Sequence, residues 1–209
     1  MTTRRWFTRK NITVLGLATA GFLAAVAGPA SAAHAAEIPP PAKELPADFQ
    51  IQENGYYCGP SATRVALSAQ GKTYTQDEVA QKLGTTPNGT DSINQVTSAL
   101  NAELGPDRYH SVTIAAAKAD DAQIAQLKTD VVTAVNAGKP VVTNVAGVIT
   151  DDDGQTHSYK GGHYLPIVGY ANDGATVKIA DSWDKDGNPY YTLGADKMAN
   201  WIATRGYTA

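Results

Sequence analysis

The sequence predicts an α+β fold, and two observations carry this prediction. Helical patterns with clear start and stop residues follow one another up to residue 105, whereas apolar, β-branched runs separated by turns fill the chain from residue 140 onward. Runs of helices followed by runs of strands, without regular alternation, are typical of α+β folds. We therefore expect a helical first half and an antiparallel sheet in the second half.

The first predicted helix starts at or just after Cys58, the only cysteine in the chain. Pro60 suits its first turn, where a missing N–H costs nothing, and Gly71 follows as a stop. Apolar residues recur between them at helical spacing: Ala62, Val65, Ala66 and Ala69. The sulfur is thus predicted to lie at a helix N-terminus, where the partial positive charge favours a thiolate.

Three further helices are predicted from their capping residues. Thr75 and Glu78 form a capping box that opens a short helix ending at Gly84. A second box opens the helix over 92–103. The longest helical pattern covers 120–137, with an apolar stripe on one face.

The second half contains four runs predicted as strands, at residues 140–148, 163–170, 176–180 and 190–193. The Asn-Asp-Gly sequence at 172–174 is a hairpin-type turn and joins the second run to the third. Residues 108–114 are predicted to form an earlier strand, and residues 197–203 a short helix.

Residues 1–36 are predicted to be an export signal and not part of the fold. Four basic residues precede an apolar, alanine-rich stretch, and small-x-small cleavage sites follow near residues 30–35. The pair Arg4-Arg5 resembles the twin-arginine export motif of bacteria, with general secretion as the alternative route. We therefore expect a secreted bacterial protein that keeps no membrane anchor once the signal is removed.

Residues 37–48 contain four prolines and are predicted to be an extended lead to a domain over 49–209. Without residues 1–36 the chain has 13 basic and 20 acidic residues, a formal charge of −7. This charge argues against nucleic acid or an anionic membrane as the main partner. We expect a monomer with no cofactor and no metal. The acidic run at 184–188 lacks the spacing of a calcium loop and is predicted to be a β-turn.

A lone cysteine is most often a small buried hydrophobe, so its downstream partners decide its role. His163 follows two glycines and opens a predicted strand, and Asp181 ends the next strand. Pairing across the turn at 172–174 brings these two residues together. A carboxylate on one imidazole nitrogen would fix the tautomer and leave the other nitrogen for the sulfur of Cys58.

These motifs resemble those of the papain-like cysteine peptidases, and they stand in the same order: Gln52, Tyr57-Cys58-Gly59-Pro60, Gly162-His163-Tyr164 and Asp181-Ser182-Trp183. The most similar family is the thirty-ninth, the bacteriocin-processing or double-glycine-leader peptidases with their freestanding relatives, and the resemblance covers roughly residues 48–205. It implies a papain-like fold, in which a helix that starts at the cysteine packs on an antiparallel sheet carrying the histidine and the aspartate.

The resemblance also implies roles for single residues. Cys58 would be the nucleophile, His163 the base and then the acid, and Asp181 the group that orients His163. The Gln52 side chain and the Cys58 backbone N–H would form the oxyanion hole. Gly162 and Trp183 would contact the substrate, and Trp183 would also shield the His–Asp contact from water.

A secreted, freestanding hydrolase acting on a peptide or protein substrate is therefore the expected function. Two alternatives stay open. One is a catalytically silent domain of this fold that binds peptide or cell-wall material. The other is a cysteine amidase or acyltransferase that acts on peptidoglycan.

Overall fold

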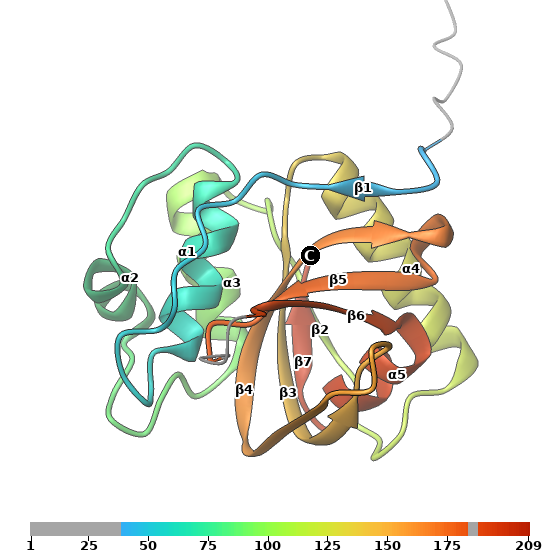
Figure 1. Ribbon diagram of the computed structural model, residues 1–209. Coiled ribbons are helices and arrows are strands. Elements are labelled where there is room, and N and C mark those ends of the chain that lie inside the picture. The colour runs from blue at the N-terminus through green and yellow to red at the C-terminus, as the bar shows by residue number, and fades with distance from the viewer. Residues whose placement is uncertain (1–38, 184–187) are drawn as a thin grey trace, which may run out of the picture. The chain divides into compact units, whose positions relative to one another are not determined.

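The computed structural model describes residues 39–183 and 188–209 (Figure 1). The predicted export signal at 1–36 and most of the predicted turn at 184–188 lie outside them. The first half of the described chain contains, in order, β1 (Lys43–Glu44), α1 (Cys58–Ser68), α2 (Gln76–Leu83), α3 (Ile93–Leu104) and β2 (Ser111–Thr113).

The second half begins with a long helix and then supplies most of the sheet. Its elements are α4 (Asp121–Asn136), β3 (Val141–Thr150), β4 (Thr156–Ala171), the 3-10 turn η1 (Asn172–Gly174), β5 (Thr176–Ala180), β6 (Tyr190–Gly194), α5 (Ala195–Ile202) and β7 (Gly206–Thr208). The α+β class predicted from the sequence is confirmed.

The predicted capping residues account for where the helices begin. Thr75 and Asp120 each accept a hydrogen bond from the backbone N–H three residues later, and Ser92 belongs to a capping box of the same kind. Gly84 ends α2 in the left-handed conformation, at φ 65°, which a glycine adopts without strain.

The strands form one antiparallel sheet in the order β2-β7-β3-β4-β5-β6, and β1 also pairs with β4. Helices cover both faces of this sheet. Leu127 of α4 and Met198 of α5 share one buried core with β3, β4 and β5, whereas Ala66 of α1 belongs to a second core with Val142 and Tyr164. Figure 1 shows α1, α2 and α3 on the left, α4 and α5 on the right, and β3 and β4 between them.

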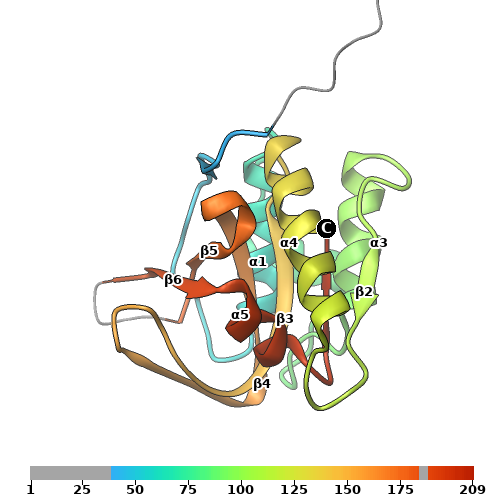
Figure 2. The same ribbon diagram turned by 90° about the vertical axis from the view of Figure 1, so that its right-hand side faces the viewer.

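The same division is visible from the side. Figure 2 views the domain from the right of Figure 1, and α4 and α5 face the viewer. A third, small cluster joins Val65 of α1 to Val168 and Ala180 of the sheet. The helix that starts at Cys58 is thus packed directly on the strands that carry the downstream residues.

Strand β4 is longer than the sequence suggested. His163 lies inside it and not at its start, because β3 and β4 form a hairpin that extends to Thr150 and Thr156. Val145 pairs with His163 and Gly147 with Tyr159, so three residues of β4 lie opposite one residue of β3. Such bulges re-aim side chains and are frequent beside active sites.

Part of the described lead, residues 39–48, joins the sheet as β1. Lys43 pairs with Tyr170 and Glu44 with Gly169, and Leu45 contributes to the core that faces α4. A side chain at Gly169 would come within 2.8 Å of the Lys43 carbonyl oxygen, so this approach needs a glycine. In residues 39–183 and 188–209, no helix is long and apolar enough to cross a membrane.

Candidate active site

Cys58 is the first residue of α1 and is partly buried. No side chain caps this helix and no acidic residue lies in its first turn, so its free N–H groups keep their positive character. Backbone N–H groups of Gly59 and Tyr164 donate hydrogen bonds to the sulfur. Gly59 also has to be a glycine, because a Cβ there would lie 2.3 Å from Oγ1 of Thr90.

His163 connects the sulfur to a buried acid. The imidazole forms a hydrogen bond with Cys58, and its Nε2 lies 2.9 Å from Oδ1 of Asp181. His163 is 4% exposed and Asp181 is fully buried. Because Nε2 faces the carboxylate, Nδ1 is the nitrogen left for the sulfur. The predicted pairing of the start of one strand with the end of the next therefore brings the expected residues together.

The three groups shift one another's ionisation. Burial opposes a charge on the Cys58 thiol, but the hydrogen bond and charge of His163, with two backbone N–H groups, outweigh it and lower the pKa of the thiol. Burial also disfavours the imidazolium, yet hydrogen bonds and charges from Asp181 and Cys58 raise the pKa of His163 to about 9. Burial raises and His163 lowers the pKa of Asp181, with a net decrease. This pattern favours a thiolate beside an imidazolium near neutral pH.

Gln52 is buried close to the same acid. Its backbone N–H donates to the Ser182 carbonyl at 3.0 Å, and its Oε1 accepts from the Ser182 hydroxyl at 3.1 Å. Nε2 donates to the Asn54 carbonyl at 2.6 Å. An amide nitrogen carries two N–H bonds, so one donor of Gln52 remains for another acceptor.

The two residues expected to contact substrate lie in different surroundings. Gly162 has φ 104° and lies beside the side chains of Arg205 and Asn144. Trp183 donates its backbone N–H to Oδ1 of Asp181 at 2.9 Å, and the residue as a whole is 41% exposed. The aromatic ring that stacks on His163 belongs to another residue, Tyr159, with ring centroids 4.0 Å apart.

Two tyrosines that the sequence patterns did not indicate, Tyr159 and Tyr191, also contact the acid. Their hydroxyls donate to Oδ2 of Asp181 at 2.5 and 3.0 Å. Tyr191 pairs with Ile179 across β5 and β6, and Tyr159 lies just before the bulge of β4. A signal existed for Tyr191 only: within the predicted strand at 190–193, it alternates with neighbours that face the other side of the sheet.

A second His–Asp pair is formed by His157, six residues before His163 on the same strand, and the buried Asp151. His157 Nε2 lies 3.0 Å from Oδ2 of Asp151, and the His157 ring stacks on Tyr191 with centroids 3.9 Å apart. Oδ1 of Asp151 accepts the backbone N–H groups of Asp153 and Gln155. His157 belongs to β4 and pairs with Ile149, because the β3–β4 hairpin extends that far.

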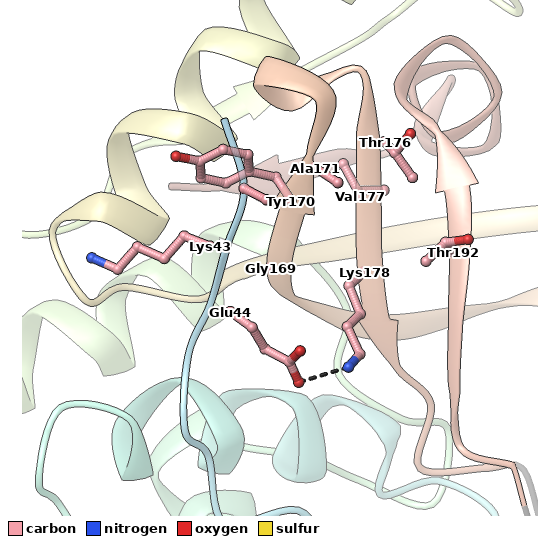
Figure 3. A pocket seen from close by; sticks show the side chains of 10 residues that line it. Lys43, Glu44, Gly169, Tyr170, Ala171, Thr176, Val177, Lys178 and Thr192 are labelled. Carbon is pink, nitrogen blue, oxygen red and sulfur yellow. Dashed lines mark hydrogen bonds and ion pairs between the residues drawn. The ribbon is translucent and has the colours of Figure 1, made fainter. Parts of the chain in front are cut away.

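A pocket is present elsewhere on the sheet, beside β1 (Figure 3). Glu44 and Lys178 form an ion pair at 2.7 Å on its wall. None of the predicted site residues lines it, so this pocket is separate from the cysteine. No group of three or more His, Cys, Asp or Glu side chains in the described part of the chain could hold a metal ion.

Comparisons with known proteins concern the family and the fold of the chain. The model of the family described as Peptidase_C39 like matches residues 44–209. A C39-like peptidase from Bacillus anthracis has a similar structure at 14% identity and a TM-score of 0.54, with 79% of this chain and 96% of that chain covered. The peptidase domain of Streptococcus ComA, a bifunctional ABC transporter, gives 14% identity and a TM-score of 0.50, with 76% and 94% covered. No curated protein matches the chain. The expected papain-like fold of the C39 type is thereby confirmed.

Proposed function

The chain belongs to the Peptidase_C39 like family, and on that premise we propose that it is a secreted cysteine peptidase that uses Cys58, His163 and Asp181. The observation that carries this proposal is the continuous contact from sulfur to imidazole to buried carboxylate. A structural cysteine needs neither a helix N-terminus nor a histidine that an acid holds in place.

In the first half of the reaction, the Cys58 thiolate attacks the carbonyl carbon of the scissile peptide bond. A C–S bond forms, and the carbonyl oxygen takes the negative charge. As the C–N bond breaks, the His163 imidazolium gives its proton to the leaving amine. The products of this step are a free amine and a thioester on Cys58.

In the second half, neutral His163 takes a proton from water while that water attacks the thioester. The C–S bond breaks, the acid product leaves, and the thiolate–imidazolium pair is restored. Throughout the cycle, Asp181 keeps Nε2 of His163 occupied, so that Nδ1 stays directed at the sulfur.

The oxyanion of both tetrahedral intermediates needs fixed donors. The backbone N–H of Cys58 belongs to the uncapped first turn of α1, and the free donor of Gln52 is the second candidate. Ser182 holds Gln52 by two hydrogen bonds, so the amide would be fixed before substrate arrives. Gly162 and Trp183 are proposed to contact the peptide on either side of this centre.

Export is part of the proposal and rests on residues 1–36 alone. We expect the mature protein outside the cell, as a monomer, with its N-terminus near residue 37. Mass spectrometry of the protein recovered from culture medium tests this. An intact N-terminus on protein that remains in the cytoplasm would contradict it.

Cleavage profiling tests the activity. The full chain and its Cys58→Ala variant are incubated with a peptide library and, in parallel, with purified cell wall. Peptide cleavage by the parent chain and none by the variant supports a peptidase. Release of cell-wall fragments without peptide cleavage would favour the amidase alternative, and binding without any cleavage would favour the silent domain.

A further inference from the structure

We propose that Tyr159 and Tyr191 are positioning residues, which hold Asp181 so that its other oxygen faces His163. This inference rests on the proposed function, since it assigns a role in the same site. Both tyrosines act through Asp181 and not on the substrate.

The two oxygens of Asp181 have separate donors. Oδ1 faces Nε2 of His163 at 2.9 Å and accepts the backbone N–H of Trp183 at 2.9 Å. Oδ2 accepts the Tyr159 hydroxyl at 2.5 Å and the Tyr191 hydroxyl at 3.0 Å. The terminal torsion of an aspartate is broad, so donors on both oxygens are what fix its plane.

Because Asp181 is buried, its charged form depends on these hydrogen-bond donors. Asp181 is fully buried, and a buried carboxylate without hydrogen bonds is strongly disfavoured. Hydrogen bonds to an ionised group are about twice as strong as those between neutral groups. The two phenols therefore support the charged form of the acid and also set its direction.

Tyr159 contributes a second contact to the same unit. Its ring stacks on His163 at 4.0 Å and on Trp201 at 5.8 Å between centroids. The ring thus covers one face of the imidazole while its hydroxyl reaches the carboxylate. This is the shielding role that sequence analysis had assigned to Trp183.

Tyr191 packs against the histidine of the second His–Asp pair. The ring of His157 lies against Tyr191 at 3.9 Å, and Asp151 fixes His157 in turn. The order of contacts is therefore Asp151, His157, Tyr191, Asp181 and His163, from the hairpin end to the site.

Phenylalanine substitutions test this role, because they remove only the hydroxyl. We expect Tyr159→Phe and Tyr191→Phe each to lower kcat by about tenfold with KM nearly unchanged. Without its donors the buried carboxylate is less favourable as an anion, so it stabilises the imidazolium less. A weaker imidazolium lowers the pKa of the Cys58 thiol less, so the pH at which iodoacetamide labelling of Cys58 rises should move above that of the parent chain.

Tyr207→Phe is the matched control. Tyr207 is also buried, and its hydroxyl donates to Oδ2 of Asp130 at 2.7 Å, outside the site. We expect it to affect thermal unfolding but not the pH dependence of labelling. A parent-like kcat and labelling profile in both site variants would overturn the proposal, and so would the same shift in Tyr207→Phe. Since labelling needs no substrate, the test stands even if no peptide is cleaved, which would contradict the proposed function instead.

Arg205 carries a second, independent inference: we infer that it binds an acidic side chain of the peptide substrate beside the scissile bond. This also rests on the proposed function. The described residues include three arginines, and two of them, Arg64 and Arg108, hydrogen-bond to acceptors of the protein. Arg205 is half-buried, and its backbone N–H donates to the Ile202 carbonyl at 2.9 Å. Its guanidinium forms no hydrogen bond or ion pair with residues 39–183 or 188–209.

The place of Arg205 links it to the site. A methyl group on Gly162 would lie 3.5 Å from Nη2 of Arg205 and 3.6 Å from Oδ1 of Asn144. Gly162 directly precedes His163. Burial raises the pKa of the Tyr164 phenol and the charge of Arg205 acts against that rise, so the guanidinium is also close to the residue whose N–H contacts the sulfur.

An unpaired guanidinium beside a cleavage site matches a carboxylate, which it can bind through two parallel N–H bonds. Asp91 is the acidic residue that acts on the same Tyr164 phenol, but it forms no ion pair with Arg205. The substrate class that fits is therefore a peptide with Asp or Glu near the scissile bond.

Matched peptides with Glu, Gln or Lys at each position around the scissile bond test this. We expect the parent chain to prefer Glu at one position by about tenfold in kcat/KM, Arg205→Gln to lose that ratio, and Arg205→Glu to favour Lys instead. Lys128→Gln removes one positive charge from α4, on the other face of the sheet, and should keep the parent ratio. Equal ratios in the parent and Arg205→Gln would overturn the inference.

Binding separates this outcome from failure of the proposed function. The same peptides are titrated against Cys58→Ala by fluorescence anisotropy, where no turnover is needed. Tighter binding of the Glu peptide that disappears in Cys58→Ala/Arg205→Gln supports the acidic subsite. Equal binding of Glu and Gln peptides to Cys58→Ala would contradict it, whatever the chain cleaves.

Discussion

Strand β4 carries the histidines of two His–Asp pairs, which have similar nitrogen–oxygen distances and differ in what surrounds them. Nε2 of His163 lies 2.9 Å from Asp181, and Nε2 of His157 lies 3.0 Å from Asp151. In the first pair the imidazole continues to the sulfur of Cys58. In the second pair it ends in a stack on Tyr191.

The acids differ as well. Asp181 takes two phenol donors on its free oxygen, whereas Asp151 takes two backbone N–H groups from the turn that follows it. The second pair therefore fixes the end of the β3–β4 hairpin, and the first is directed at a nucleophile. A His–Asp contact alone does not make a catalytic unit. The imidazole must also contact a nucleophile through its other nitrogen, as His163 contacts the sulfur of Cys58.

The two pairs should differ most in the loss of kcat/KM that follows when the sulfur or its base is removed. We expect Cys58→Ala and His163→Ala to lower kcat/KM by about 10⁴-fold or more, because members of one catalytic unit fail together. His157→Ala should lower it by less than about tenfold. Steady-state assays with a shared peptide substrate compare the three. Equal losses of kcat/KM in His157→Ala and His163→Ala would contradict the assignment of catalysis to the first pair alone.

Changing each acid to its amide sharpens the comparison. Asp181→Asn should lower kcat by about 10²–10⁴-fold, because an amide no longer stabilises the imidazolium or fixes its tautomer. Asp151→Asn should leave kcat within about tenfold of the parent, since its partner does not touch the sulfur. The two variants are measured side by side at neutral pH. A greater loss of kcat in Asp151→Asn than in Asp181→Asn would contradict the assignment of the catalytic pair.

Gln52 belongs to the catalytic side of the comparison through Ser182. Gln52→Ala should lower kcat by about 10²–10³-fold without abolishing activity, as expected for one oxyanion donor. An unchanged kcat in this variant would exclude Gln52 from the oxyanion hole.

The pH dependence should reflect the first pair only. The raised pKa of His163 means that the imidazolium is favoured below about pH 9 and lost above it. Activity should therefore fall about tenfold for each pH unit above 9. On the acidic side it should fall only below the ordinary thiol pKa, because that of Cys58 is lowered. A maximum above pH 9 would contradict these directions.

The second pair should contribute to the free energy of unfolding in a pH-dependent way. Burial raises and His157 lowers the pKa of Asp151, which is lowered overall, so its contribution to folding is present above the ordinary aspartate pKa and is lost as pH falls through the lower folded value. Asp151→Asn should lower the free energy of unfolding by about 1–3 kcal/mol at pH 7, because its donors lose an ionised acceptor. Urea unfolding at pH 7 and pH 3 should give a smaller difference at pH 3. The same difference at both pH values would contradict this.

Much of the fold and of the candidate site follows from local sequence. The capping boxes at Thr75 and Asp120 placed two helices correctly, because a cap is chemistry within four residues. Cys58, His163 and Asp181 could be joined because a hairpin turn at 172–174 fixes which strand positions meet.

The features that could not be predicted from the sequence depend on contacts between residues far apart in the chain. Tyr159 was missed because the bulge that brings it under His163 arises from the register between β3 and β4. β1 was missed because two residues of a proline-rich lead form a strand only against β4. The environment of Arg205 likewise depends on Gly162 across the sheet.

The most direct test of the account is the pH dependence of iodoacetamide labelling of Cys58 in the full chain and in His163→Ala. Cys58 is the only cysteine, so a single mass shift measures it. The account predicts fast labelling of the parent chain from well below pH 7, and labelling of His163→Ala that rises only near the ordinary thiol pKa of about 8.5. Identical pH curves for the two proteins would contradict the thiolate–imidazolium pair on which the proposed function depends.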